Sequence, residues 1–129
     1  MTAPVTGPVT DPANAPVTGL QPACRVDQVA RESGVAVWVH DRAVAVFRDH
    51  EDRFYALSNI DPRTGASVLS RGIVGTRAGE TFVASPLHKQ AFRLRDGVCL
   101  DDPTLHAPTH EVRIVDDMIL IGPPASGDG

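Results

Sequence analysis

The chain has 129 residues, 42% hydrophobic and 22% charged, values typical of one soluble globular domain. Its net charge of −4 gives no reason to expect nucleic acid or an acidic membrane as a partner. The sequence contains neither a run of roughly 18–20 apolar residues, as a membrane span requires, nor a secretory signal. Two cysteines, Cys24 and Cys99, do not indicate a disulfide framework. We expect two buried free thiols in a cytoplasmic protein.

The first 22 residues have a composition of their own. Ala-Pro-Val-Thr-Gly occurs at 3–7 and again at 15–19, prolines are frequent, and aromatic, Lys and Arg residues are absent. Because nothing in this segment is large enough to build a core, we predict a disordered tail over 1–22. The domain is then expected over 23–124, with a flexible C-terminus over 125–129. A proline-rich docking ligand is the functional alternative for the tail, although it offers no basic anchor.

The remaining sequence predicts short strands. Apolar residues alternate over 35–39 and 44–47 on either side of Asp41-Arg42, which indicates a hairpin. Strands are also expected at 54–57, 81–84 and 92–94, and a second hairpin joins 112–114 to 119–121. The only helix candidate is Val26–Arg31, one or two turns long. Trp38, on a strand, is expected to fill the core. This pattern predicts an all-β sandwich or small barrel.

Two polar loops remain between the strands, at 58–66 and 85–92. Asp61-Pro62-Arg63-Thr64-Gly65 resembles the first cluster-binding loop of Rieske proteins, and Ser85-Pro86-Leu87-His88 resembles the second. The resemblance implies a Rieske-like domain of small antiparallel sheets, with both loops at one end. The four ligand positions would then be Asp61, Arg63, Ser85 and His88.

These four residues do not suit an iron–sulfur cluster. A Rieske [2Fe–2S] centre needs cysteine thiolates on one iron and neutral imidazoles on the other, and an arginine offers only hydrogen-bond donors. We therefore predict that this chain binds no cluster and no other metal. In place of a cluster, we expect a polar staple, in which Asp61 accepts from Arg63, His88 or backbone amides and Ser85 bonds across the gap.

A narrower resemblance covers roughly residues 24–122. Asn-Ile-Asp-Pro at 59–62 and Ser-Pro-Leu-x-Lys-Gln-x-Phe at 85–92 resemble the small subunit of the assimilatory, NAD(P)H-dependent siroheme nitrite reductase. The resemblance implies a cytoplasmic, cofactor-free subunit that is not catalytic alone. Its partner would be the large subunit, which is expected to carry FAD, siroheme and an iron–sulfur cluster and to reduce nitrite to ammonia in nitrate assimilation.

Basic residues near the two loops suggest how such a partner would bind. If the loops converge, the residues that make this end basic and dock the large subunit are Arg63, Arg71, His88 and Lys89. The alternative is that they are ordinary solvated charges. His40, His50, His106 and His110 do not pair with other residues at metal-ligand spacing and are expected to be surface or capping residues.

Two other functions stay open at this point. One is a Rieske-type electron carrier that uses a residual metal at His88. The other is a binding module of a different oxidoreductase, such as an aromatic-ring oxygenase.

Overall fold

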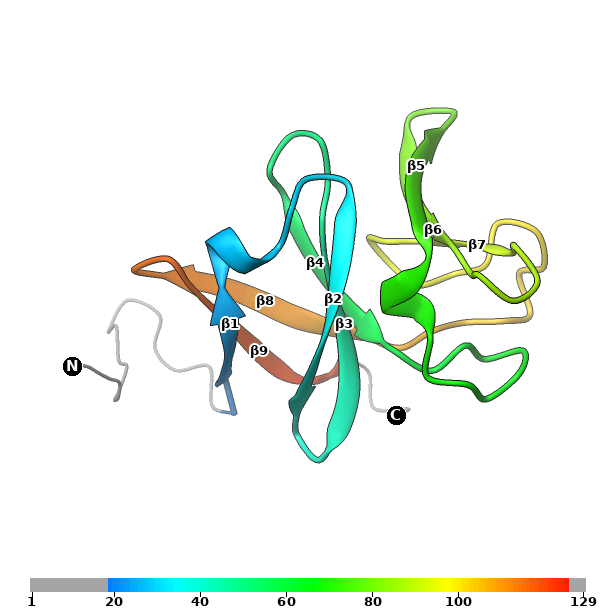
Figure 1. Cartoon of the computed structure of the whole chain (residues 1–129). Coiled ribbons are helices and arrows are strands. Elements are labelled where there is room, and N and C mark those ends of the chain that lie inside the picture. The colour runs from blue at the N-terminus through cyan, green and yellow to red at the C-terminus, as the bar shows by residue number, and fades with distance from the viewer. Residues whose placement is uncertain (1–18, 126–129) are drawn as a thin grey trace.

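The computed structural model of the chain describes residues 19–125, which form two antiparallel sheets (Figure 1). The larger sheet has the strand order β1-β9-β8-β4-β3-β2, and the smaller has the order β5-β6-β7. The all-β prediction is confirmed. Among these residues no helix is long and apolar enough to cross a membrane. The strands are β1 (Gln21–Arg25), β2 (Ser33–Val39), β3 (Arg42–Arg48), β4 (Phe54–Ser58), β5 (Ile73–Arg77), β6 (Glu80–Ala84), β7 (Ala91–Arg93), β8 (Thr109–Val115) and β9 (Met118–Pro124).

Both predicted hairpins form, and each closes through a two-residue turn. His40 and Asp41 have φ of 55° and 60° between β2 and β3, and Asp116 and Asp117 have φ of 52° and 65° between β8 and β9. Positive φ at both central residues gives the turn whose twist matches a hairpin, and aspartate tolerates it better than most residues. The first turn lies one residue earlier than the Asp41-Arg42 link predicted from the sequence.

Three local predictions need correction or extension. β1 begins at Gln21, inside the segment assigned to the tail. The helix predicted over 26–31 is a single 3-10 turn, η2 (Val26–Gln28), because Val29 leaves it with extended dihedrals and is fully buried. β5 was not predicted, and neither was the 3-10 turn η3 (Leu69–Arg71) before it. The tail prediction for residues 1–18, and the C-terminal prediction for 126–129, lie outside the described residues.

Two apolar cores lie on opposite faces of the larger sheet, and β3 contributes to both. Val44 and Val46 point to one face, while Ala45 and Phe47 point to the other, and all four are fully buried. The first core lies within the curled six-stranded sheet, where Ile119 and Ile121 from β9 complete it. The second core lies between the sheets and includes Leu57, Leu69, Val83, Phe92, Leu94, Cys99 and Ala107. The two polar loops follow β4 and β6, two strands that contribute to this second core.

Trp38 does not fill the core, so that prediction is wrong. Its side chain is 70% exposed. Val39 takes the inner face at this end of β2, which turns Trp38 outward at the edge of the sheet. At the other end of β2 the outer face is covered, because the Phe47 ring lies directly over Gly34. Both cysteines are free, as expected, but Cys24 is only half-buried.

Candidate functional site at two matching loops

The two polar loops fold as the same six-residue turn. In the first, the Asp61 carbonyl accepts from the Gly65 amide at 2.7 Å, and Asp61 Oδ1 accepts from the Arg63 amide at 2.8 Å. In the second, the Ser85 carbonyl accepts from the Lys89 amide at 2.9 Å, and Ser85 Oγ accepts from the Leu87 amide at 3.3 Å. Each loop therefore points one side-chain oxygen inward, at the position where a Rieske loop has a cysteine.

The backbone at the end of each turn follows the same scheme. The residue four places after the inward oxygen has a positive φ, 82° at Gly65 and 60° at Lys89. The amides of Asp61 and Ser85 close the loops by donating to Ala66 and Gln90 at 2.8 and 2.9 Å. A left-handed residue at this point turns the chain back sharply. Glycine does so without strain in the first loop, whereas in the second the fold imposes this conformation on a lysine.

A hydrogen bond between the two inward side chains joins the loops. Ser85 Oγ donates to Asp61 Oδ2 at 2.6 Å, and the two side chains belong to residues that are each 1% exposed. The staple predicted from the sequence is therefore present. Its further partners are the backbone amides of Arg63 and Leu87. The guanidinium of Arg63 and the imidazole of His88 make no hydrogen bond to Asp61 among the contacts of the described residues.

Asn59 anchors the first loop to the larger sheet. This residue is 3% exposed, and its amide donates to the Ala43 carbonyl in β3 at 3.0 Å. Its side chain donates to Ser67 Oγ at 2.9 Å and accepts from the Ser70 amide at 2.7 Å. Asn59 thus holds both ends of the loop at fixed positions. Its role was not predicted, since only the folded loop shows that one asparagine bridges these segments.

The side chains at this site do not fit a [2Fe–2S] cluster. The Asp61 carboxylate and the Ser85 hydroxyl already satisfy each other and the two loop amides. Carboxylate and hydroxyl oxygens are hard donors, unlike the thiolates that such a cluster requires. Arg63 cannot act as a ligand at all. Within residues 19–125, no group of three or more His, Cys, Asp or Glu side chains is arranged to hold a metal ion.

The outer surface of the loops combines unpaired positive charge with apolar side chains. In the described part of the chain, the Lys and Arg residues that form no ion pair within 4.0 Å are Arg42, Arg63, Arg71 and Lys89. Three of them are the residues predicted to dock a partner, and His88 beside them is also exposed. Arg71 is followed by Gly72, whose backbone lies directly against the Ala84 carbonyl, next to the start of the second loop.

Exposed apolar residues on the same loops were not predicted. Ile60, next to Asp61, is 38% exposed, and Leu87, in the second loop, is 47% exposed. The guanidinium of Arg63 helps to lower the pKa of Asp102, although hydrogen bonds from Thr104 lower it more. An apolar centre with a charged border is the usual composition of a protein interface.

The other histidines play structural parts or lie at the surface. His110 is 5% exposed, and its Nδ1 lies 2.7 Å from the Gly122 carbonyl. Burial lowers the pKa of His110 below its ordinary value. His40 Nε2 lies 2.8 Å from the Ile121 carbonyl, whereas His50 and His106 are exposed. His110 is thus buried, contrary to the surface or capping position expected for it.

Comparison with known proteins identifies the family to which this fold and these loops belong. Residues 19–122 match the model of the Rieske-like [2Fe-2S] domain. The small subunit of nitrite reductase (NADH) from Escherichia coli K12 is 44% identical over 99 residues, which cover 76% of this chain and 92% of that protein. The chain belongs to the family of nitrite reductase small subunits.

A solved structure and a longer relative extend this family assignment. A Mycobacterium tuberculosis crystal structure, described as an NADH-dependent nitrite reductase small subunit, has a TM-score of 0.80 and 40% identity, over 86% of this chain and 100% of that one. The large subunit of nitrite reductase [NAD(P)H] from Klebsiella oxytoca is 36% identical over 102 residues, 79% of this chain but 11% of that protein. A module like this small subunit therefore also occurs inside a large-subunit chain.

Proposed function

We propose that this small-subunit homologue acts by contact. It would bind the large subunit of a cytoplasmic NAD(P)H-dependent siroheme nitrite reductase through its loop end, and would support nitrite reduction in nitrate assimilation without a cofactor of its own. The observation that carries the proposal is the buried Ser85–Asp61 hydrogen bond of 2.6 Å. It occupies the inward positions of both loops, and this supports a loop end that carries no cluster and serves as a contact surface.

The Klebsiella relative supports the choice of partner. A segment similar to this chain forms about a tenth of that large subunit. When two modules occur in one chain, they are held at a high effective concentration, and the separate small subunit needs an interface to reach the same proximity. FAD, siroheme and the iron–sulfur cluster would all belong to the large subunit in this proposal.

The charge distribution supports the loop end as the docking surface. Elsewhere in the described chain most arginines are neutralised by carboxylates, for example Arg53 by Asp49 at 2.9 Å. Arg63, Arg71 and Lys89 have no such partner among these residues, and Lys89 lies on the same loop as exposed Leu87. Charges of this kind steer association and mainly raise its rate, while the apolar centre supplies most of the affinity.

Charge reversal tests this surface. The double variant Arg63→Glu, Lys89→Glu should weaken capture of the co-expressed large subunit and slow its association, most strongly at low salt. Arg42→Glu is the matched control, because Arg42 is also an exposed, unpaired cation but lies at the turn between β2 and β3. Equal binding by wild type and the double variant would refute docking through the loops. If the control, with half the charge change of the double variant, weakened binding by half as much, only net charge would matter.

Leu87→Ser separates the apolar contribution from the charges. Because Leu87 is 47% exposed, its replacement should leave the free energy of unfolding nearly unchanged, within about 0.5 kcal/mol. The same replacement should raise the dissociation rate of the complex, because the side chain lies at the centre of the proposed interface. Unchanged dissociation would exclude Leu87 from the contact.

A further inference from the structure

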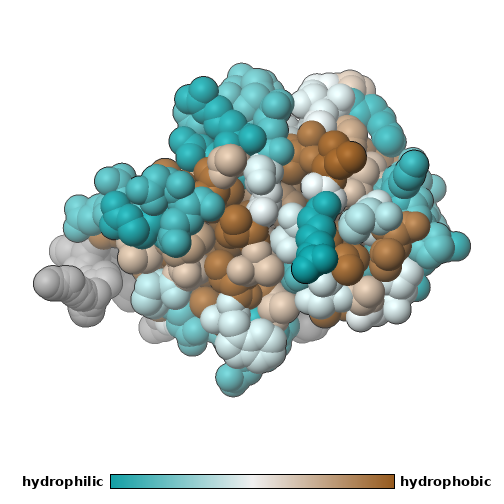
Figure 2. Space-filling model, viewed as in Figure 1, coloured by the Kyte–Doolittle hydropathy of each residue, from teal (hydrophilic) through white to brown (hydrophobic). Residues whose placement is uncertain are grey.

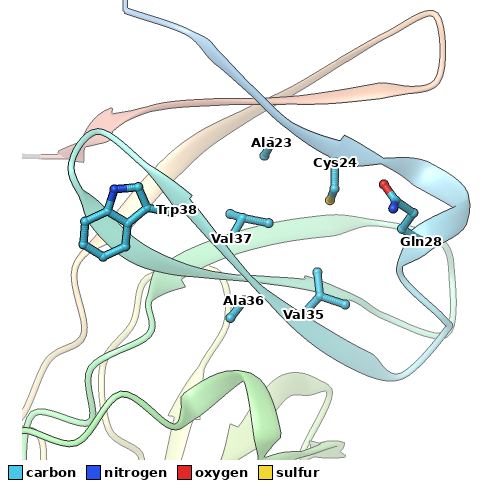
Figure 3. A pocket seen from close by; sticks show the side chains of 7 residues that line it. All are labelled: Ala23, Cys24, Gln28, Val35, Ala36, Val37 and Trp38. Atoms are coloured by element: carbon cyan, nitrogen blue, oxygen red, sulfur yellow. The ribbon is translucent and has the colours of Figure 1, made fainter.

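The two edge strands of the larger sheet lie next to each other without pairing. β1 and β2 are the first and last strands in its order, and Figure 3 shows a groove between them, where Val35 and Val37 face Ala23 and Cys24. In Figure 2, brown apolar surface is visible over the middle of this face, between β1 and β2. No backbone ladder joins β1 to β2 in the described chain along this boundary, which we call the seam, so the contacts at its two ends hold the curled sheet closed.

Hydrogen bonds at each end of the seam connect its two sides. At one end, Arg48 of β3 donates to the Val29 carbonyl, which follows η2, at 2.9 Å. At the other end lies His40, in the turn between β2 and β3. Its amide donates to Gln21 Oε1 in β1 at 3.0 Å, and its Nε2 lies 2.8 Å from the Ile121 carbonyl in β9. His40 therefore ties the turn to both strands on the far side of the seam.

A second imidazole is buried beside this contact. The ring of His110, in β8, has its centroid 6.3 Å from that of His40, and its Nδ1 lies 2.7 Å from the Gly122 carbonyl. Because a carbonyl oxygen only accepts, Nδ1 carries the proton of the neutral ring and Nε2 carries none. Nε2 is buried and has no hydrogen-bond partner within residues 19–125. A second proton would therefore place an unpaired positive charge inside the fold.

Few titratable side chains lie on the elements packed around His110. They are His40, Asp41 and Arg42 at the turn between β2 and β3, Tyr55 on β4, and Glu111 and Arg113 on β8. The tyrosine packs against the second core, the aspartate is exposed, and the two residues of β8 pair with each other at 2.8 Å. The remaining two, His40 and Arg42, act on His110, and both are basic.

We propose that the His40–His110 pair is an acid-sensitive latch, which holds the seam closed while His110 is neutral and releases it when His110 binds a second proton. The charged ring moves toward water because a buried, unpaired charge is costly. The adjacent bond of His40 to the Ile121 carbonyl breaks with that movement, and the apolar side chains of the groove become accessible. This inference does not depend on the proposed function.

The direction of the pH dependence follows from the surroundings of His110. Burial lowers its pKa most, the hydrogen bond to the Gly122 carbonyl opposes this shift, and His40 and Arg42 lower the pKa further. A histidine released into water titrates at about pH 6.5. The latch is therefore closed above about pH 6.5 and loses stability as the pH falls below this value, with a rise of up to about tenfold in the opening constant for each pH unit.

Nuclear magnetic resonance of the isotope-labelled full chain tests the latch between about pH 7.5 and about pH 5. The His110 ring should show the neutral form protonated at Nδ1 and should take up a proton only below about pH 6.5. The signal of the His40 amide, which is bound to Gln21, should shift at the same pH. The Asn59 amide, bound to the Ala43 carbonyl in β3, is the internal control and should not shift. A dye that binds exposed apolar surface should bind over the same pH range.

Two variants make the test decisive. His110→Asn retains a donor near the Nδ1 position but cannot become charged, so it should abolish the acid response, whereas His106→Asn, at an exposed position, should leave it unchanged. If the His110 variant does not fold, the ring titration of the wild-type chain decides. An acid response that persists in His110→Asn, or a His110 ring that gains its proton without any change at His40, would overturn the proposal. So would an Asn59 amide that shifts together with the His40 amide, because acid would then loosen the whole fold.

Discussion

Replacing Asp61 with alanine tests whether the hydrogen bond between the loops stabilises the fold. Asp61 accepts from the Ser85 hydroxyl at 2.6 Å and from the Arg63 amide at 2.8 Å, in a position that is 1% exposed. A hydrogen bond to a charged group contributes about 1.5–3 kcal/mol, and a buried donor left without an acceptor costs about 1–3 kcal/mol. Because these terms overlap, we expect Asp61→Ala to lower the free energy of unfolding by about 2–4 kcal/mol.

Urea unfolding followed by far-ultraviolet circular dichroism measures this change. Trp38 fluorescence is less suitable, because the indole is already 70% exposed in the fold. For a domain of this size each kcal/mol corresponds to about 4–8 °C in Tm, so thermal unfolding gives an independent value. Asp61→Asn should cost only about 1 kcal/mol, since the amide oxygen still accepts from Arg63 and the amide nitrogen can donate to Ser85.

A double-mutant cycle assigns the loss to the bond itself. Ser85→Ala alone should also destabilise the fold, and the double variant should lose less than the two single losses together, by about 1–2 kcal/mol. A loss below about 0.5 kcal/mol for Asp61→Ala, or strictly additive losses in the cycle, would refute the role given to this bond.

Other predictions concern the core and the response to acid. Trp38→Ser should change stability by less than about 0.5 kcal/mol, whereas Phe92→Ala, at a fully buried position, should cost about 3–5 kcal/mol; comparable losses in urea unfolding would contradict the orientation of β2. The hydrogen bond from Arg31, with others nearby, lowers the pKa of Asp52 from 3.8 to about 2. The stability this gives is present above about pH 4 and is lost as the pH falls through about 2. Asp52→Asn should flatten that part of the stability–pH curve, and an unchanged acid profile would exclude this contribution.

The sequence predicts the strands in which large apolar side chains recur at every second position. β2, β3, β8 and β9 show this recurrence, so their hairpins were found, although the middle of β3 and of β9 is buried on both faces. β5 shows no such pattern, because Ile73 at its start is 75% exposed and none of its residues is buried. Its pairing with β6 depends on the turn between the two strands and on the segments of the protein around them. Period-two patterning alone does not detect a strand of this kind.

Alternation also does not say which face of a strand is covered. Trp38 and Val39 point to opposite sides of β2, and only the curling of the larger sheet around its own core decides that Val39 is buried. The same limit applies to the candidate site. The resemblance to Rieske loops located Asp61 and Ser85, but the bond between them joins residues far apart in the sequence, and its length follows from the folded loops. The anchoring by Asn59 could not be predicted for the same reason.

Iron and labile-sulfide analysis of the purified chain tests most directly the claim that it acts without a cluster. Asp61→Cys, Arg63→His and Ser85→Cys combined, with His88 retained, restores the four Rieske ligand types and is the positive control for chemical reconstitution. We expect stoichiometric iron and sulfide in this triple variant and neither in the wild-type chain treated in the same way. Stoichiometric iron and sulfide in the wild-type chain, with a redox-active paramagnetic signal, would contradict it.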